Sequence, residues 1–281
     1  MTDPRIAPHP EWLTKLGSDG SIQAQRTVAV PVADLLRTPN GPRDRQVIFG
    51  EIFHSYGACG DHIYGMTEDT RYVGFIALSA LGDAGDATHR VKTQWAQAFA
   101  RPDFKSPDRI SLPHNAWVQV TGSVDRFFET PQGFVPDTQL QEWVHPSAST
   151  GWAVCRDPAS VALAYLGTPY LWGGNSPMGI DCSGLVQAAM LACAIKCPGD
   201  SDLMETHLHG APPTTPAHNQ LYFWKGHVAL TISETELVHA NAHAMAVTIE
   251  NIDDAIARIS NAGDGPVTRR LQLTTGYLAT G

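Results

Sequence analysis

Cys182 has the residue type and the surroundings of a thiol nucleophile. It follows Asp181, a good helix N-cap. A thiol in the first turn of a helix feels the positive end of the helix dipole and unpaired backbone N–H groups, and both favour the reactive thiolate. The sequence therefore predicts a nucleophile at the start of a buried helix, whose apolar face is formed by Cys182, Leu185, Val186, Ala189, Met190 and Cys193.

The competing interpretation is that Cys182 is a small core residue, as Cys193 is expected to be. The neighbouring sequence favours the nucleophile. Gly173, Gly174 and Gly179 precede Cys182, and Ser183-Gly184 follows it. Glycines at such positions allow a substrate to approach the backbone closely.

A general base for this thiol is expected at His227. His227 opens the alternating run 227–232, which is typical of a half-buried strand, and a polar turn separates this run from the second strand, 237–240. A three-residue turn centred on Ser233 would place His227 directly opposite His239, about 5 Å apart at Cβ. His239 would then orient His227 toward Cys182, as the third member of a triad does. Two structural histidines on a hairpin are the alternative.

These segments resemble the NlpC/p60 family of cell-wall cysteine peptidases. The resemblance is carried by GTPYLWGG at 167–174 and GIDCSGLV at 179–186, followed in the expected order by GHVA at 226–229 and VHA at 238–240. It covers about 130 residues and implies a papain-like catalytic domain in which Cys182, His227 and His239 are catalytic. A weaker match, DTRYVGF at 69–75, resembles a motif of the bacterial SH3-like domains that precede the catalytic domain in one branch of the family.

In that branch the enzymes cut between γ-D-glutamate and a diamino acid in short peptidoglycan peptides with a free N-terminal L-alanine. By position, the resemblance implies that Asp181, Ser183 and Tyr72 bind the terminal ammonium. Trp172, in the first motif, is also placed among the substrate-binding residues. One carboxylate beside two hydroxyl oxygens suits a primary amine. The alternatives are that Asp181 only caps its helix and that Tyr72 is a core tyrosine.

The elements that position these residues divide the chain into three expected domains. Short β-rich runs at 27–32, 46–53 and 72–77 predict a small barrel, and runs at 116–124 and 133–135 predict a second β module. Beyond 144–147 the pattern changes to helix, turn, helix and strands, with a first short helix over 158–166. We therefore expect an α+β protein: an N-terminal segment with a first SH3-like module (1–82), a second SH3-like module (83–146) and a peptidase domain (147–281).

Composition limits the remaining function classes. The 281 residues carry a formal net charge of -9, which argues against a nucleic-acid or anionic-membrane surface. No basic and apolar leader opens the sequence, so a cytoplasmic location is expected, with no membrane partner. Five cysteines at irregular positions predict free thiols. Cys193 and Cys197 have helical spacing and no matching second pair, so neither a metal nor a cofactor is expected.

The leading hypothesis is a γ-D-glutamyl-diamino acid endopeptidase that recycles wall peptides, with peptidoglycan-derived peptides as its partners. An amidase or acyltransferase that uses the same Cys and His is the enzymatic alternative. A wall-binding protein with a decayed catalytic domain is the non-enzymatic one. The sequence leaves the oligomeric state and the diamino acid open.

Overall fold

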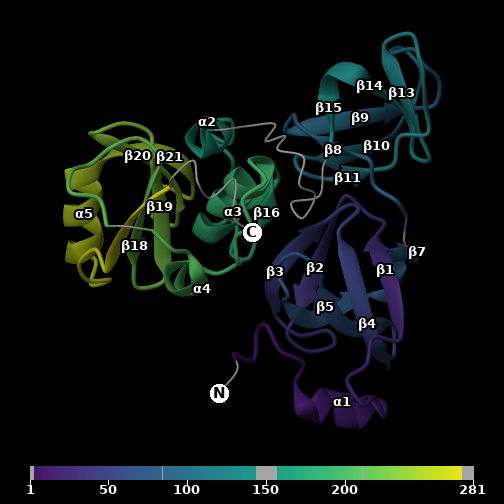
Figure 1. Cartoon of the computed structure of the whole chain (residues 1–281), viewed down its shortest axis with the longest axis horizontal. Helices are drawn as coiled ribbons and strands as arrows, with labels where there is room; N and C mark the ends of the chain where they lie inside the picture. Colours follow the sequence, from purple (N-terminus) through teal and green to yellow (C-terminus); the bar gives the residue numbers. More distant parts are fainter. Residues whose placement is uncertain (1–2, 84, 144–156, 211, 274–281) are drawn as a thin grey trace. The chain divides into compact units, whose positions relative to one another are not determined.

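The computed structural model describes residues 3–83, 85–143, 157–210 and 212–273 (Figure 1). The chain divides into two compact units, an N-terminal unit, Met1–Val144, and a C-terminal unit, His145–Gly281. The change of pattern expected at 144–147 lies outside the described residues. Each unit is described by itself below.

The first part of the N-terminal unit is a seven-stranded antiparallel sheet preceded by helix α1 (Pro10–Leu16). Its strands are β1 (Ala24–Val28), β2 (Val32–Leu36), β3 (Arg43–Ile48), β4 (Ile52–Cys59), β5 (His62–Thr67), β6 (Val73–Ala77) and β7 (Leu81–Asp83). They are ordered β3-β2-β6-β5-β4-β1-β7, and a 3-10 turn, η1 (Leu78–Ala80), joins β6 to β7. Aromatic side chains from β4, β5 and β6 fill the core beneath α1.

Two of the runs expected as single strands here are each broken by a turn. The run 27–32 covers the end of β1 and the start of β2, and the run 46–53 covers the end of β3 and the start of β4. Pro31 and Gly50 lie in these turns. Gly50 has φ +84°, and a Cβ there would lie 2.2 Å from the carbonyl oxygen of Trp117, so the backbone turns where no other residue fits.

The second part of the N-terminal unit consists of two small antiparallel sheets around one apolar core. The first is ordered β10-β9-β14-β13-β12 and the second β11-β8-β15. The Trp117 N–H donates to the Phe49 carbonyl at 3.0 Å, which ties this part to the first. The SH3-like identity of both parts stays a prediction. The elements are β8 (His89–Val91), β9 (Trp95–Phe99), β10 (Asp108–Pro113), β11 (Trp117–Val118), β12 (Gly122–Val124), β13 (Phe127–Thr130), β14 (Gly133–Pro136), η2 (Asp137–Gln139) and β15 (Leu140–Glu142).

The C-terminal unit is built on a five-stranded antiparallel sheet in the order β21-β20-β19-β18-β22. A two-stranded hairpin of β16 and β17 precedes its central helix, α3. The elements are α2 (Pro158–Leu163), β16 (Asn175–Ser176), β17 (Gly179–Ile180), α3 (Cys182–Ala192), α4 (Ser201–His207), β18 (Gln220–Trp224), β19 (His227–Thr231), β20 (Glu236–Asn241), β21 (Ala246–Asn251), α5 (Ile252–Asn261) and β22 (Arg269–Gln272).

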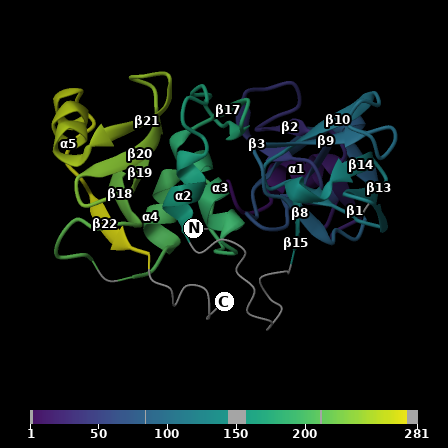
Figure 2. The same cartoon turned by 90° about the horizontal axis from the view of Figure 1, so that it is seen from above.

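Alternation along the strands gives this sheet two buried faces (Figures 1 and 2). Leu221 and Phe223 of β18 pack in one core with α2 and α3, whereas Tyr222 and Trp224 pack in a second core with α5. Successive side chains of a strand point to opposite faces, so one strand supplies both cores. The sheet thereby holds α3 against one face and leaves α5 on the other.

Both helices expected in this unit form, but they end earlier than their patterns indicate. The first ends at Leu163 rather than at 166, because Tyr165 and Leu166 continue as single turns that bond three residues back. Helix α3 ends at Ala192 with Cys193 as its C-cap, so Cys197 lies beyond the helix and the helical spacing expected for this pair is wrong. Both cysteines are buried in the core.

Candidate active site

Cys182 is the first residue of α3, as the sequence predicts. Asp181 caps the helix, with Oδ1 accepting the Gly184 N–H at 2.7 Å. The same carboxylate accepts the Ser183 hydroxyl at 2.9 Å on Oδ1 and the Gly173 N–H at 2.9 Å on Oδ2. Asp181 therefore fixes both the start of the helix and the glycine loop before it.

The glycines around Cys182 are needed for close backbone packing. A Cβ at Gly184 would lie 2.3 Å from the carbonyl oxygen of Gly174, and a Cβ at Gly174 would lie 2.4 Å from that of Gly179. Real Cβ atoms do not approach carbonyl oxygens so closely, so any side chain here would push the loop away from α3. Close packing of the loop against the start of α3 therefore explains why glycines surround Cys182.

The two predicted histidines meet on the hairpin of β19 and β20. His227 Nε2 lies 3.0 Å from His239 Nδ1, and the two ring centroids are 5.1 Å apart. The expected register is wrong, however. Leu230 pairs with Val238 and Thr231 with Leu237, so the turn is centred on Glu234 and the two histidines are diagonal neighbours rather than directly opposite. The imidazoles reach each other across the diagonal.

The turn shifts because the Ser233 hydroxyl accepts the N–H groups of Thr235 and Glu236, at 3.2 and 3.0 Å. Ile232 then pairs with Glu236 and closes the loop over Ser233, Glu234 and Thr235. Local side-chain bonds of this kind set where a turn begins. The centre of the turn therefore moves by one residue, from Ser233 to Glu234, and the strand pairing shifts by two residues.

Two further residues continue this chain of contacts, and the sequence patterns did not indicate them. His239 Nε2 lies 3.1 Å from Glu250 Oε2. Arg258 donates from Nε to Glu250 Oε1 at 2.8 Å and from its terminal nitrogen to Oε2 at 2.6 Å. Glu250 is on β21 and Arg258 on α5, so the contact depends on how α5 folds back beside the sheet.

The histidines are neutral at neutral pH. Burial lowers the pKa of His227 to about 3, and the charges of His239 and Arg258 lower it further, against the opposing effect of Glu250. Burial likewise lowers the pKa of His239 to about 4. Hydrogen bonds from Arg258 lower the pKa of Glu250, which is therefore a carboxylate.

The cysteine is a thiol in its resting state, contrary to the expected thiolate. Burial raises the pKa of Cys182 to about 12, and the charge of Asp181 adds to the effect. The backbone N–H groups of Val228 and Ser183 bond the sulfur and lower the pKa, as expected for a helix start, but burial outweighs them. The bond from Val228 places the sulfur beside the residue that follows His227. A neutral thiol and a neutral imidazole suit general-base activation during attack.

Tyr170 is a third residue of the site to which the sequence assigned no role, although it lies in the first motif. Burial raises the pKa of its hydroxyl, and the charges of Cys182 and Asp181 raise it further. Its hydroxyl is therefore protonated and able to donate a hydrogen bond close to the nucleophile. The sequence motif contains Tyr170, but only the folded structure shows that Cys182 and Asp181 lie near its hydroxyl.

The expected substrate-binding residues fall into two groups. Asp181 and Ser183, both buried, flank Cys182 in the C-terminal unit, where Trp172 is 68% exposed. Tyr72 is in the N-terminal unit, 1% exposed, with the Arg45 guanidinium 4.5 Å from its ring centroid. Substrate contact by any of the four stays a prediction.

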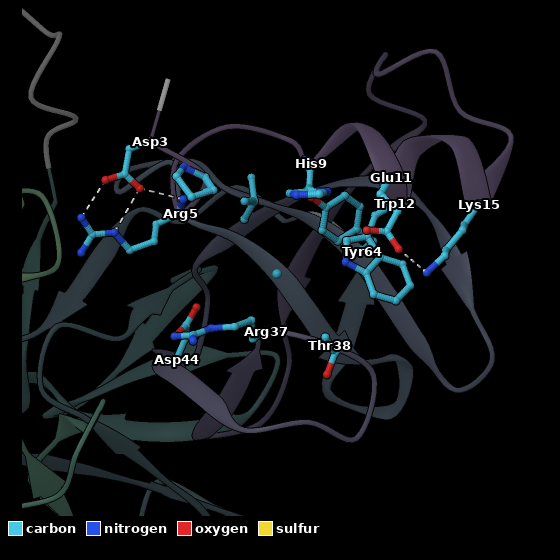
Figure 3. A pocket seen from close by; sticks show the side chains of 13 residues that line it. Asp3, Arg5, His9, Glu11, Trp12, Lys15, Arg37, Thr38, Asp44 and Tyr64 are labelled. Atoms are coloured by element: carbon cyan, nitrogen blue, oxygen red, sulfur yellow. Dashed lines mark hydrogen bonds and ion pairs between the residues drawn. The ribbon is translucent and has the colours of Figure 1, made fainter. Parts of the chain in front are cut away.

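A separate cavity of about 770 Å³ lies within the N-terminal unit, between the segment before β1 and the sheet (Figure 3). Its charged side chains pair with one another: Arg5 with Asp3, Lys15 with Glu11, and Arg37 with Asp44. None of the predicted site residues lines it.

Two classes of feature are absent from the described parts of the chain. No cluster of three or more His, Cys, Asp or Glu side chains is placed to hold a metal ion within residues 3–83, 85–143, 157–210 and 212–273. Among the same residues, no helix has the length and apolar character of a membrane span.

Comparison with known proteins identifies the C-terminal unit. The sequence profile of the NlpC/P60 family matches residues 167–260. Dipeptidyl-peptidase 6 of Lysinibacillus sphaericus is 33% identical over 179 residues, which is 60% of this chain and 66% of that protein. The gamma-D-glutamyl-L-lysine dipeptidyl-peptidase of Bacillus subtilis is 29% identical over 109 residues, 36% of this chain and 37% of that protein. The chain thus spans just under two thirds of the first relative and little more than a third of the second.

A solved structure shows the same fold. The crystal structure of an NlpC/P60 family protein from Bacillus cereus superposes with a TM-score of 0.70 at 16% identity, over 82% of this chain and 95% of that one. This likeness confirms the α+β fold expected from the sequence. The profile match, which includes Cys182, His227 and His239, shows that the C-terminal unit carries an NlpC/P60 domain.

Proposed function

We propose that this protein hydrolyses the bond between γ-D-glutamate and a diamino acid in short peptidoglycan peptides that carry a free N-terminal L-alanine. The observation that carries the proposal is the position of Asp181 and Ser183 on either side of Cys182, with the Ser183 hydroxyl donating to Asp181. The carboxylate and the hydroxyl oxygen suit a primary ammonium next to the nucleophile. The relatives' names, which include a gamma-D-glutamyl-L-lysine dipeptidyl-peptidase, support the same bond.

The reaction proceeds through a thioester. His227 takes the proton of the Cys182 thiol through Nδ1 as the sulfur attacks the γ-carbonyl carbon, and it then returns the proton to the departing amine when the C–N bond breaks. Water, deprotonated by His227, attacks the thioester and releases the γ-carboxylate and the thiol. The Cys182 backbone N–H and the Tyr170 hydroxyl donate to the oxyanion in both steps.

Substrate selection follows from the amine site. An acetylated N-terminus would leave the Asp181 carboxylate without its cationic partner, at a cost of about 1.5–3 kcal/mol, or roughly ten- to a hundredfold in rate. In this proposal the Tyr72 hydroxyl is a second acceptor for the terminal ammonium, as the family resemblance implies. Free wall peptides, rather than polymeric wall, are then the substrates, as a recycling enzyme in the cytoplasm requires.

The proposal is tested with a panel of L-Ala-γ-D-Glu-diamino acid peptides, free and N-acetylated, beside intact sacculi. We expect cleavage of free tripeptides and tetrapeptides after γ-D-glutamate, at least tenfold lower kcat/KM on acetylated peptides, and no release from sacculi. Equal cleavage of free and acetylated peptides would refute the amine site. Transfer of the acyl group to an added amine, with no hydrolysis, would instead indicate an acyltransferase.

A further inference from the structure

Three successive contacts connect His227 with a charged pair on the far side of β20. His227 Nε2 lies 3.0 Å from His239 Nδ1, His239 Nε2 lies 3.1 Å from Glu250 Oε2, and Arg258 holds both oxygens of Glu250. His239 is fully buried, whereas Glu250 and Arg258 are 22% and 25% exposed. The ionic end of this series thus lies at the surface, His239 in the middle is buried, and His227 at the other end is half-buried.

The ring nitrogen that carries each proton along these contacts can be assigned by starting from the ionised carboxylate of Glu250. An ionised carboxylate only accepts hydrogen bonds, so the proton between Glu250 and His239 must be on His239 Nε2. A neutral imidazole carries one proton, so His239 Nδ1 is an acceptor. His227 Nε2 must therefore carry the proton that it shares with His239, which leaves His227 Nδ1 without one.

We propose that Glu250, held by Arg258, is a positioning residue that selects the tautomer of His227 in which Nδ1 can accept the proton of Cys182. This assignment rests on the general-base role of His227 in the proposed function, and it extends the Cys182, His227 and His239 set by two residues. Neither Glu250 nor Arg258 touches the reacting atoms. Both act through His239.

The neighbouring groups agree with this order. The pKa values of both histidines lie well below neutrality because of burial, so each ring carries a single proton and the tautomer is defined. The second charged group near the chain is Arg258, which holds Glu250 in the ionised form. A doubly protonated His239 would also donate from Nδ1. His227 Nε2 would then be the acceptor and His227 Nδ1 would carry the proton, so His227 could not take the proton of Cys182.

The direct test is the ¹⁵N spectrum of the imidazole rings at neutral pH, because the shifts of protonated and unprotonated ring nitrogens differ. In the unaltered protein we expect a proton on Nε2 of both His227 and His239. In Glu250→Gln the amide can accept through its oxygen or donate through its nitrogen, so we expect a mixture of tautomers. A single, unchanged tautomer in folded Glu250→Gln would overturn the proposal, as would a proton on His227 Nδ1 in the unaltered protein.

Two rate measurements accompany the spectrum. Peptide hydrolysis by Glu250→Gln is expected to lose about ten- to a hundredfold in kcat with little change in KM, the range for partners that orient a functional imidazole. Alkylation of Cys182 by iodoacetamide, read by mass spectrometry of the peptide that contains it, is expected to slow in parallel. Unchanged alkylation and hydrolysis rates would contradict the proposal.

Matched variants separate positioning from general damage. Glu236→Gln removes an exposed carboxylate from the neighbouring strand and should change neither the tautomer nor the rates. Arg258→Lys keeps the charge but loses the bidentate bond, so its effect should fall between those of the other two variants. If Glu250→Gln does not fold, the ¹⁵N spectra of Arg258→Lys and of the unaltered protein test the proposed tautomer instead.

The outcome is distinguishable from failure of the proposed function. If the protein cuts none of the wall peptides but shows the expected tautomers, with slower alkylation in Glu250→Gln, the positioning role stands and the proposed substrate is wrong. If folded Glu250→Gln cuts the peptides at the full rate, the proposed substrate stands and the positioning role is wrong.

Discussion

His227 and His239 contact each other through ring nitrogens 3.0 Å apart although the hairpin register makes them diagonal rather than opposite neighbours. His239 contacts His227 on one side and Glu250 on the other, and the proposed mechanism assigns it the orienting role and His227 the role of base. Its replacement should therefore be less harmful than that of His227.

The comparison of His239→Ala with His227→Ala tests this division of roles. We expect kcat/KM to fall about ten- to a hundredfold for His239→Ala and at least about a thousandfold for His227→Ala. His239→Asn should recover part of the rate because its amide can accept from His227 and donate to Glu250, whereas His227→Asn should recover none. The reverse order of effects would contradict the assignment of base and orienter.

The two buried cysteines at the ends of α3, Cys182 at its start and Cys193 at its C-cap, should respond differently to substitution. Cys182→Ala should abolish hydrolysis while the folded state persists, since the side chain is at the helix start and little buried volume is removed. Cys193→Ala, in the apolar core, should lower the free energy of unfolding by about 1 kcal/mol and leave kcat within about twofold. Activity assays and urea unfolding of both variants check this pair. Equal loss of activity in two folded variants would remove Cys182 from its role.

The contact between Gly184 and Gly174 predicts a local packing defect. In Gly184→Ala the new methyl group would meet the Gly174 carbonyl at 2.3 Å, so the loop or the helix start must move. We expect a loss of about 1–3 kcal/mol in the free energy of unfolding, together with a fall in kcat, because Cys182 moves with the helix start. Gly226→Ala provides a contrast, since nothing lies within 4 Å of its Cβ position and its φ of +76° is the one source of strain. Identical free energies of unfolding for Gly184→Ala and the unaltered protein would show that the loop moves to accommodate the methyl group without cost.

Buried neutral histidines predict that the protein is less stable in mild acid. Burial lowers the pKa of His114, which is 7% exposed, to about 4, and the charge of Arg90 lowers it further. Its unfolded pKa is about 6.5. The stabilisation is therefore complete above pH 6.5 and is lost as the pH falls toward 4, at up to about 1.4 kcal/mol per pH unit. In His114→Gln the fall in unfolding free energy between pH 6.5 and 4.5 should be smaller. An unchanged slope would show that His114 protonates equally in both states.

The part of the site that depends on neighbouring residues was predictable from sequence. Asp181 caps α3 and places Cys182 in its first turn through bonds that span three residues, so the pattern was sufficient. The hairpin of His227 and His239 was predictable as an element, but its register was not. That register depends on two hydrogen bonds to the Ser233 hydroxyl, which move the turn centre by one residue and the strand pairing by two.

The part that depends on tertiary packing was not predictable. Glu250 and Arg258 are ordinary polar residues of a strand and a helix, and no local pattern distinguishes them. Their role follows from β21 pairing with β20 and from α5 returning beside it. The resting thiol of Cys182 was missed for the same reason, since the helix start was visible in the sequence but the burial that outweighs it was not.

The central claim is that Cys182 cleaves wall peptides after γ-D-glutamate when the N-terminal amine is free. Its most direct test is kcat/KM for L-Ala-γ-D-Glu-diamino acid tripeptides, free and acetylated, with the unaltered protein, Cys182→Ala, Ser183→Ala and Tyr72→Phe. We predict cleavage of the γ-D-glutamyl bond, none by Cys182→Ala, and a loss of about tenfold or more on acetylation and in Tyr72→Phe and Ser183→Ala. Cleavage by folded Cys182→Ala, or equal rates on free and acetylated peptides, would contradict the account.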